Sequence, residues 1–314
     1  MKKSKLTALL LTSALLLSGC GGTAPAGNEA ASVTGEPTAD AAIQFTDMVG
    51  REIVLDEPAA RVIALSAADC EIIYALGAED VLIGRGEYCD WPAEVIDIPA
   101  VASGRETNIE QILSLQPDVL LMADMDQTEE QVAQLENAGI TVVVSDADDI
   151  EGVYRSITNT GAMLGKDTEA AALVSGMKDT FTAISDEAAD KGETVYFEVS
   201  PLQYGLWAAG ADTFMNEIAE MMGLTNIFSD VSGWCEVSEE QVIERAPDYI
   251  VTISMYFGEG PTPAEEILSR AGWESIPAVA NNKILNLANN ELSRPGPRLA
   301  DGAQALYDFI SAES

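Results

Sequence analysis

The sequence contains no histidine, and this absence excludes several kinds of functional site. Without histidine there is no histidine base for a serine or cysteine nucleophile, no histidine zinc site and no histidine-ligated haem. The chain also lacks a G-x-S-x-G nucleophile elbow and a phosphate-binding P-loop. Many hydrolases have alternating helices and strands, but the absence of these motifs disfavours an α/β hydrolase here. We expect a protein that is not an enzyme, needs no cofactor and has no metal site, because no cluster of cysteines and carboxylates is visible.

Basic residues are also scarce, with 16 Lys and Arg against 52 Asp and Glu. A chain this acidic is not drawn to nucleic acid or anionic lipid by electrostatics, so we expect no nucleic-acid partner. A cationic surface on a partner protein would attract it.

Cysteine is the third scarce residue, and it occurs four times. Beyond Cys20 the chain has Cys70, Cys89 and Cys235. An odd number of thiols cannot form a complete disulfide framework. Either one bridge forms or the thiols stay unpaired and buried, and the sequence leaves both alternatives open.

The N-terminus has the pattern of an export signal. Three lysines among the first five residues precede an apolar stretch from Leu6 to Leu17, which is too short to span a bilayer as a helix. The stretch ends in L-S-G-C and resembles a bacterial lipoprotein signal, so we expect residues 1–19 to be removed and Cys20 to be acylated. An ordinary secretory signal with a chance cysteine is the alternative.

The residues that follow the signal cannot build a core. Residues 20–40 are rich in Gly, Ala, Pro, Ser and Thr, which predicts a flexible tether. Signal removal takes away three of the 16 basic residues and none of the 52 acidic ones, which leaves a formal charge of −39.

Helical and strand patterns alternate through the rest of the chain. The runs RVIALS, PDVLLMA and ITVVVSD are continuously apolar, as are TVYFEVS, PDYIVTIS and KILNLA in the second half. Continuous apolar strands between helices are typical of a parallel sheet that is covered on both faces. We therefore expect an α/β protein with an N-terminal lobe at 41–150 and a C-terminal lobe at 193–314, each Rossmann-like.

A helical linker, residues 151–192, is predicted between these lobes. From Asp167 to Lys191 apolar residues recur with a period near 3.6, with no proline and one glycine. This pattern predicts a single long helix of about 24 residues. A helix of this length between two matching units is best interpreted as a spine that joins two lobes.

Two segments 130 residues apart, NIEQILSLQPDVLL and SEEQVIERAPDYIV, are nearly the same. Asn108 and Ser238 can each cap a helix, and Glu110 and Glu240 then occupy its second position, where a carboxylate suits the positive helix end. A proline seven residues after each glutamate ends the helix. Either glutamate alone is an ordinary first-turn residue. The pair predicts that a pseudo-twofold molecule presents two carboxylates to a partner with its own twofold symmetry.

These segments carry a family resemblance, together with RVIALSAADCEIIYALGAEDVLIG, EYCDWPAEV, IPAVANNKILNLA and ELSRPGPRL. Over about residues 45–313 the chain resembles the substrate-binding lipoproteins of ABC importers in the iron-siderophore/cobalamin family. The resemblance implies two lobes joined by a long helix, a ligand cleft between the lobes, and a monomer at the cell surface or in the periplasm, anchored through lipidated Cys20. It also implies that Glu110 and Glu240 dock onto arginines of a permease dimer with its ATPase subunits. A signalling or adhesion lipoprotein that keeps this fold is a further alternative.

Ligands of open α/β sheets lie at the carboxyl ends of the strands. The loops predicted there contain nine aromatic or arginine side chains, namely Tyr88, Trp91, Arg105, Tyr204, Trp207, Trp234, Tyr256, Phe257 and Arg294. We expect ligand contacts from six of them, which are Tyr88, Arg105, Trp207, Trp234, Tyr256 and Arg294. Trp91 and Tyr204 are expected to pack under loops. The resemblance itself places aromatic residues at the positions of Tyr88 and Trp234.

The ligand is predicted from the charge of these loops. Cobalamin binders of the family can have further tryptophans near the positions that Gly104 and Ala123 occupy here. This sequence has no tryptophan at those positions. Arg105 is instead expected to face Arg294 across the cleft. Two guanidinium groups favour carboxylate, hydroxamate or catecholate oxygens. A ferric siderophore is therefore preferred over cobalamin, and haem is less favoured still.

Overall fold

The computed structural model describes residues 42–123, 129–189, 192–254, 260–287 and 290–312, apart from the side chain of Arg105. The predicted signal peptide and the whole of the predicted tether, Cys20 included, lie outside the described residues. No described helix is both long and apolar enough to cross a membrane.

The first half of the chain forms a five-stranded sheet in which every pairing is parallel, with the order β5-β4-β3-β6-β7. Its strands are β3 (Val62–Ala64), β4 (Leu82–Gly86), β5 (Ala100–Val101), β6 (Val119–Met122) and β7 (Thr141–Val144). Its helices are α1 (Ala67–Ala75), α2 (Ile109–Leu115) and α3 (Glu129–Asn137), with 3₁₀ turns at Glu79–Val81, Ala93–Asp97 and Gly104–Glu106. An antiparallel hairpin of β1 (Ile43–Thr46) and β2 (Glu52–Leu55), which was not predicted, precedes the sheet.

The second half forms a mixed sheet with the order β11-β9-β8-β12-β13, and β10 also pairs with β8. Its strands are β8 (Thr194–Ser200), β9 (Trp207–Ala209), β10 (Thr225–Asn226), β11 (Trp234–Glu236), β12 (Tyr249–Thr252) and β13 (Ile284–Asn286). Its helices are α6 (Phe214–Met221), α7 (Glu239–Arg245), α8 (Pro263–Leu268), α9 (Pro277–Ala280) and α10 (Leu299–Ala312), with 3₁₀ turns at Leu202–Tyr204 and Trp273–Ser275. The apolar strands β8, β12 and β13 pair in parallel as predicted, whereas β9 and β11 add an antiparallel extension that the pattern did not reveal.

Two helices, α4 (Ile150–Leu164) and α5 (Asp167–Glu187), lie between the sheets in the sequence. The helix predicted over 167–191 is therefore shorter than expected, because Ala188 turns to an extended backbone with ψ 142°. Helix α4 was missed. A side chain at Gly161 of α4 would collide with Ala170 of α5, so the glycine permits the close packing of these two helices.

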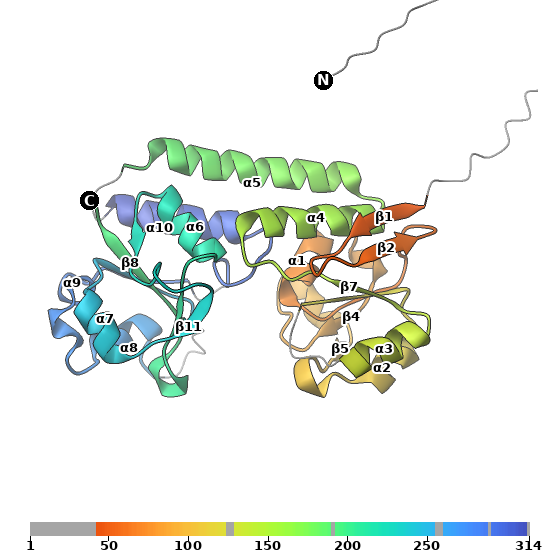
Figure 1. Ribbon diagram of the computed structural model, residues 1–314, viewed down its shortest axis with the longest axis horizontal. Coiled ribbons are helices and arrows are strands. Elements are labelled where there is room, and N and C mark those ends of the chain that lie inside the picture. Colours follow the sequence, from red (N-terminus) through yellow and green to blue (C-terminus); the bar gives the residue numbers. More distant parts are fainter. Residues whose placement is uncertain (1–41, 124–128, 190–191, 255–259, 288–289, 313–314) are drawn as a thin grey trace, which may run out of the picture. The chain divides into compact units, whose positions relative to one another are not determined.

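One apolar core is shared by both halves of the chain. Helix α5 packs on α4 and on α10, as Figure 1 shows, and also contacts α6. Of the apolar residues predicted to face inward from α5, Ala170, Met177, Phe181 and Ile184 are buried in one cluster with side chains of α1, α4, α6, α10 and β8. Residues Asp40–Ser314 accordingly form one unit, and the lobe boundaries near 150 and 192 stay predictions.

A buried ion pair lies inside the second sheet region. Arg270, just after α8, donates to both carboxylate oxygens of Glu198 on β8 at 2.6 and 3.0 Å, and both side chains are at most 2% exposed. Arg270 also donates to Glu266 of α8 at 2.5 Å, and its guanidinium lies 4.5 Å from the ring centroid of Trp273. Burial raises the pKa of Glu198 despite the hydrogen bonds from Arg270, which act in the opposite direction.

We predict that Arg270→Met lowers the free energy of unfolding by about 3–5 kcal/mol, because it leaves the carboxylate of Glu198 buried without a cation. Because burial raises the pKa of Glu198, this carboxylate takes up a proton more readily as the pH falls, which removes the unpaired charge. The loss in free energy of unfolding should therefore be smaller at pH 5 than at pH 8. Urea unfolding measures both. The double variant Glu198→Gln/Arg270→Met should recover part of the loss; a double variant that is no more stable than Arg270→Met contradicts the interpretation.

Candidate functional site

Exposed aromatic rings gather at the loops where ligand contacts were predicted. Among the described residues, the exposed aromatic side chains are Tyr88 (69%), Trp91 (47%), Tyr204 (77%), Trp207 (41%) and Trp234 (38%). The first two follow the carboxyl end of β4, Tyr204 follows that of β8, and Trp207 pairs with Ser200, the last residue of β8. The prediction that Trp91 and Tyr204 pack under loops is therefore wrong, because both rings face solvent.

Trp234 is the most constrained of these rings. It begins β11 opposite Ala209 of β9, and its ring meets the ring of Phe214 edge-on, with centroids 5.4 Å apart. Phe214 is the first residue of α6 and is buried. The contact fixes one side of the Trp234 indole and leaves the rest available.

Two predicted ligand residues cannot be placed. Tyr256, like its neighbour Phe257, lies outside the described residues. Arg105 belongs to the 3₁₀ turn Gly104–Glu106, but its side chain is not described. The predicted contacts from Tyr88, Trp207 and Trp234 stay predictions.

Arg294 is bound by protein carboxylates. Its Nη1 donates to Glu71 Oε1 at 2.9 Å and to Asp90 Oδ1 at 2.6 Å, and its Nη2 donates to the backbone oxygen of Tyr88 at 3.4 Å. The side chain is 14% exposed. The charge of Arg294 is therefore matched within the chain, which was not predicted, and its contact with a ligand stays a prediction.

Glu71 and Arg298 complete this ion-pair network, and the sequence analysis missed both. Arg298 Nε and Nη2 donate to Glu71 at 2.9 and 2.7 Å, and the guanidinium lies 4.6 Å from the ring centroid of Trp91. Glu71 is buried, and its carboxylate accepts hydrogen bonds from both arginines. One feature of the sequence could have indicated that Glu71 is buried. It is followed directly by the apolar run IIYAL, within a helix that has no polar face.

Helix α1 buries three ionisable side chains in a row near its start. Helix α1 is capped by Ser66, whose Oγ accepts from the backbone N–H of Asp69. Asp69, Cys70 and Glu71 are all buried. Asp69 accepts a hydrogen bond of 2.7 Å from Ser145 Oγ, but its Oδ1 has no hydrogen-bond partner among the described residues. Burial raises the pKa of Asp69 to about 6, against the opposing hydrogen bond from Ser145.

The two predicted docking glutamates occupy matching positions. Glu110 and Glu240 are both exposed and are the second residues of α2 and α7. Asn108 Oδ1 accepts from the N–H of Gln111 at 3.0 Å, and Ser238 forms a full capping box, which confirms both predicted caps. The pKa of Glu240 is lowered by a backbone N–H and by Ser238. A role in docking stays a prediction.

The duplication continues into the strands that follow. Asp118 Oδ2 accepts from the N–H groups of Ala60 and Arg61 at 3.0 and 2.9 Å, directly before β3. Asp248 Oδ2 accepts from the N–H and Oγ1 of Thr194 at 2.9 Å each, at the start of β8. In each half, this aspartate ties the start of one strand to the start of its parallel neighbour. The glutamate eight residues earlier is thereby held in the same way relative to each sheet.

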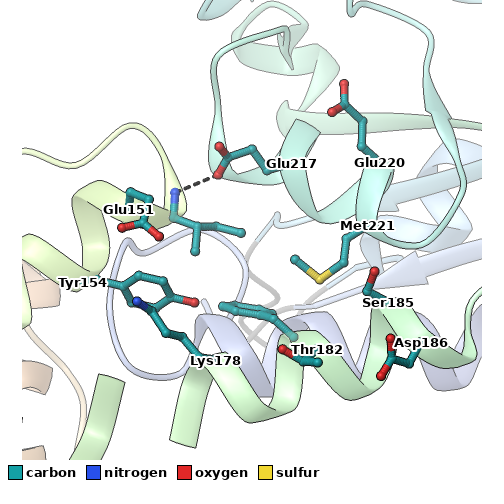
Figure 2. Close-up of a pocket in the computed structure, with 11 residues that line it drawn as sticks. Glu151, Tyr154, Lys178, Thr182, Ser185, Asp186, Glu217, Glu220 and Met221 are labelled. Atoms are coloured by element: carbon teal, nitrogen blue, oxygen red, sulfur yellow. Dashed lines mark hydrogen bonds between the residues drawn. The ribbon is translucent and has the colours of Figure 1, made fainter. Parts of the chain in front are cut away.

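A cavity of about 680 Å³ lies away from all these residues, among α4, α5 and α6 (Figure 2). Glu217 accepts a 2.7 Å hydrogen bond from the N–H of Ile150 there, and the ammonium of Lys178 lies 4.6 Å from the ring centroid of Tyr154. Burial and two nearby carboxylates raise the pKa of Tyr154 to about 12. None of the predicted ligand residues lines this cavity. Among the described residues, no group of three or more Cys, Asp and Glu could hold a metal ion.

Comparisons with known proteins agree on the fold. A family model for the periplasmic binding protein matches residues 62–291. The chain is 30% identical to the uncharacterized ABC transporter substrate-binding lipoprotein YvrC of Bacillus subtilis, over 98% of this chain and 97% of that one. It is 28% identical to the vitamin B12-binding protein of Salmonella choleraesuis, over 81% of this chain and 91% of that one.

A solved structure extends the likeness to three dimensions. The ABC-type Fe³⁺-hydroxamate transport system from Saccharomonospora viridis matches with a TM-score of 0.72 and 25% identity, over 85% of this chain and 98% of that one. The predicted α/β class and two-lobed architecture are confirmed.

We predict that Asp69→Asn increases stability at neutral pH. A native pKa of about 6, above the ordinary 3.8, means that the stability contributed by the protonated Asp69 is complete below pH 4 and lost as pH rises through 6. Removing the charge should therefore raise the free energy of unfolding at pH 8 by about 3 kcal/mol and change it little at pH 4. Urea unfolding at both values measures this, with exposed Asp56→Asn as control. Equal differences at the two pH values would count against a charged, buried Asp69.

Proposed function

Because this chain belongs to the periplasmic binding protein family, we propose that it is an extracytoplasmic binding protein that captures a metal chelate and delivers it to an ABC importer. It carries out no catalysis in this proposal. It is held at the cell surface or in the periplasm by lipidated Cys20, as the name of the Bacillus subtilis relative supports. The observation that carries the proposal is a set of exposed aromatic rings, four of them at or just after the carboxyl ends of β4 and β8 and the fifth, Trp234, on β11.

The structure changes the order of the ligand candidates. A ferric siderophore was preferred because two guanidinium groups were expected to face the cleft, but Arg294 is paired with Glu71 and Asp90. Large exposed rings suit a bulky ligand with apolar faces. Several curated relatives are named for cobalamin or vitamin B12. We therefore place a cobalamin-type corrinoid first.

A ferric siderophore is the second candidate, and one specific contact favours it. Asp90 is 47% exposed on its side chain, so an anionic ligand could replace it at Arg294 Nη1 without breaking the buried pair with Glu71. The relative of known structure named for Fe³⁺-hydroxamate transport supports the same class. Haem ranks third, since no histidine exists to ligate its iron.

The residues divide into two roles in this proposal. Tyr88, Trp207 and Trp234 contact the ligand, joined by Trp91, and Tyr256 and Arg105 stay as predicted contacts. Arg294 acts mainly by positioning, because it holds Asp90 and the backbone of Tyr88 against α1. Glu110 and Glu240 dock onto arginines of the two permease subunits.

We predict that the aromatic side chains carry the affinity for a corrinoid. Trp207→Ala and Trp234→Ala should each weaken cyanocobalamin binding about 5- to 30-fold, the scale of losing part of a buried ring. Val54→Ala, an exposed apolar residue on β2, is the matched control and should bind normally. Isothermal titration calorimetry measures all three.

The variant Asp90→Asn separates the two ligand classes. It removes the negative charge of Asp90 and so weakens the hold of this side chain on Arg294 Nη1, which should tighten binding of a ferric hydroxamate siderophore and leave cyanocobalamin unchanged. If the unmodified protein binds neither cyanocobalamin, a ferric siderophore nor haem, the ligand assignment is wrong.

We predict that Glu110→Ala and Glu240→Ala each leave ligand affinity unchanged and reduce transport, and that the double variant is worse. Loss of a desolvated charge pair costs about 2–5 kcal/mol of docking. Glu130→Ala is the control, because Glu130 is likewise exposed at the second position of α3. Uptake of labelled ligand in cells measures transport. Normal uptake by both single variants would reduce the glutamates to helix-end stabilisers.

A further inference from the structure

Cys70 and Cys89 lie against each other in the core of the first half. Cys70 is in the first turn of α1, and Cys89 is in the loop after β4. Both thiols are free in the structure, belong to the same buried cluster and point at the same backbone oxygen, that of Ala64, at 3.7 and 3.9 Å. Neither is more than 2% exposed. The adjacency links two segments that are about 20 residues apart in sequence.

The two segments are those that shape the candidate site. Cys89 stands between Tyr88 and Asp90, and Trp91 follows. Cys70 stands between Asp69 and Glu71, the carboxylate that binds Arg294 and Arg298. A covalent link here would fasten the aromatic loop to the helix turn that already holds it through Arg294.

We propose that Cys70 and Cys89 form a disulfide in the exported protein and that this bond fixes the loop of Tyr88, Asp90 and Trp91. The bond forms by exchange with an oxidised disulfide, either of a dithiol oxidoreductase or of a small thiol. One sulfur–sulfur bond forms, both S–H bonds are lost, two protons leave, and the donor disulfide is reduced to two thiols. The extracytoplasmic location given by the proposed function supplies such an oxidant. The proposal does not depend on which ligand binds.

The order of folding and oxidation follows from burial. The neighbouring Cys89 thiol, together with burial, raises the pKa of Cys70 well above its ordinary value. Only the thiolate attacks a disulfide, so the folded dithiol reacts slowly. Oxidation therefore occurs while the exported chain folds, and afterwards the bond is protected from reductants by the same burial.

The test is a thiol map of the full-length protein. Envelope protein is isolated with N-ethylmaleimide present throughout, denatured, and digested before and after reduction. The proposal requires a Cys70–Cys89 linked peptide two hydrogens lighter than the reduced pair, with Cys235 labelled without reduction. Labelling of both Cys70 and Cys89 before reduction overturns it, whatever a refolded sample shows.

A second measurement tests the effect on stability. Protein refolded in a glutathione redox buffer should lose about 5–10 °C in Tm when it is unfolded in the presence of a strong reductant. The variant Cys70→Ala/Cys89→Ala should show no response to reductant, and Cys235→Ala should respond like the unmodified protein. Identical Tm values with and without reductant in the unmodified protein would contradict a bond that fixes the loop. Ligand binding enters neither test, so a failure of the ligand assignment is distinguishable.

Discussion

The buried carboxylate of Glu71 is the group on which the arrangement of the site depends. A carboxylate removed from water needs compensating charge, and Glu71 obtains it from two arginines more than 220 residues away. The ion pairs with Glu71 place Arg294 and Arg298 beside α1. In the sequence these two arginines come just before the start of α10. Arg294 then binds Asp90 and the backbone of Tyr88, and Arg298 lies on Trp91. The positions of two exposed rings thus follow from one buried charge in α1.

The apolar core that α5 shares with α4 and α10 also helps to fix the position of the site. Because side chains from both sheets' helices pack in one cluster, the ion pairs of Glu71 form inside a continuous body and need not hold two parts together alone. Packing of this kind resists large hinge motion, since each sliding step would open voids in a dense interior. A ligand that binds here meets loops whose positions are largely set beforehand.

Local patterns predicted the elements, and distant contacts decided the site. Strands β3, β6 and β7, the caps of α2 and α7 and the apolar positions along α5 follow from hydrophobic period and capping chemistry, which act over a few residues. The partners of Arg294 were beyond reach, because nothing near residue 294 indicates a buried acid at residue 71. The surroundings of Trp91 were missed for the same reason, since its ring contacts Arg298 from the far end of the chain. The antiparallel strands β9 and β11 are too short to show a period.

The matching aspartates Asp118 and Asp248 affect how the two proposed docking contacts would combine on a transporter. Each aspartate fixes its own helix end by hydrogen bonds made within its own half, so the two glutamates are presented independently of each other. Two such contacts on one body combine as avidity: once the first has formed, the second faces a high effective concentration of its partner. Each contact alone can then be weak and quick to break. A binding protein built in this way can hold a transporter firmly and still leave it one half at a time.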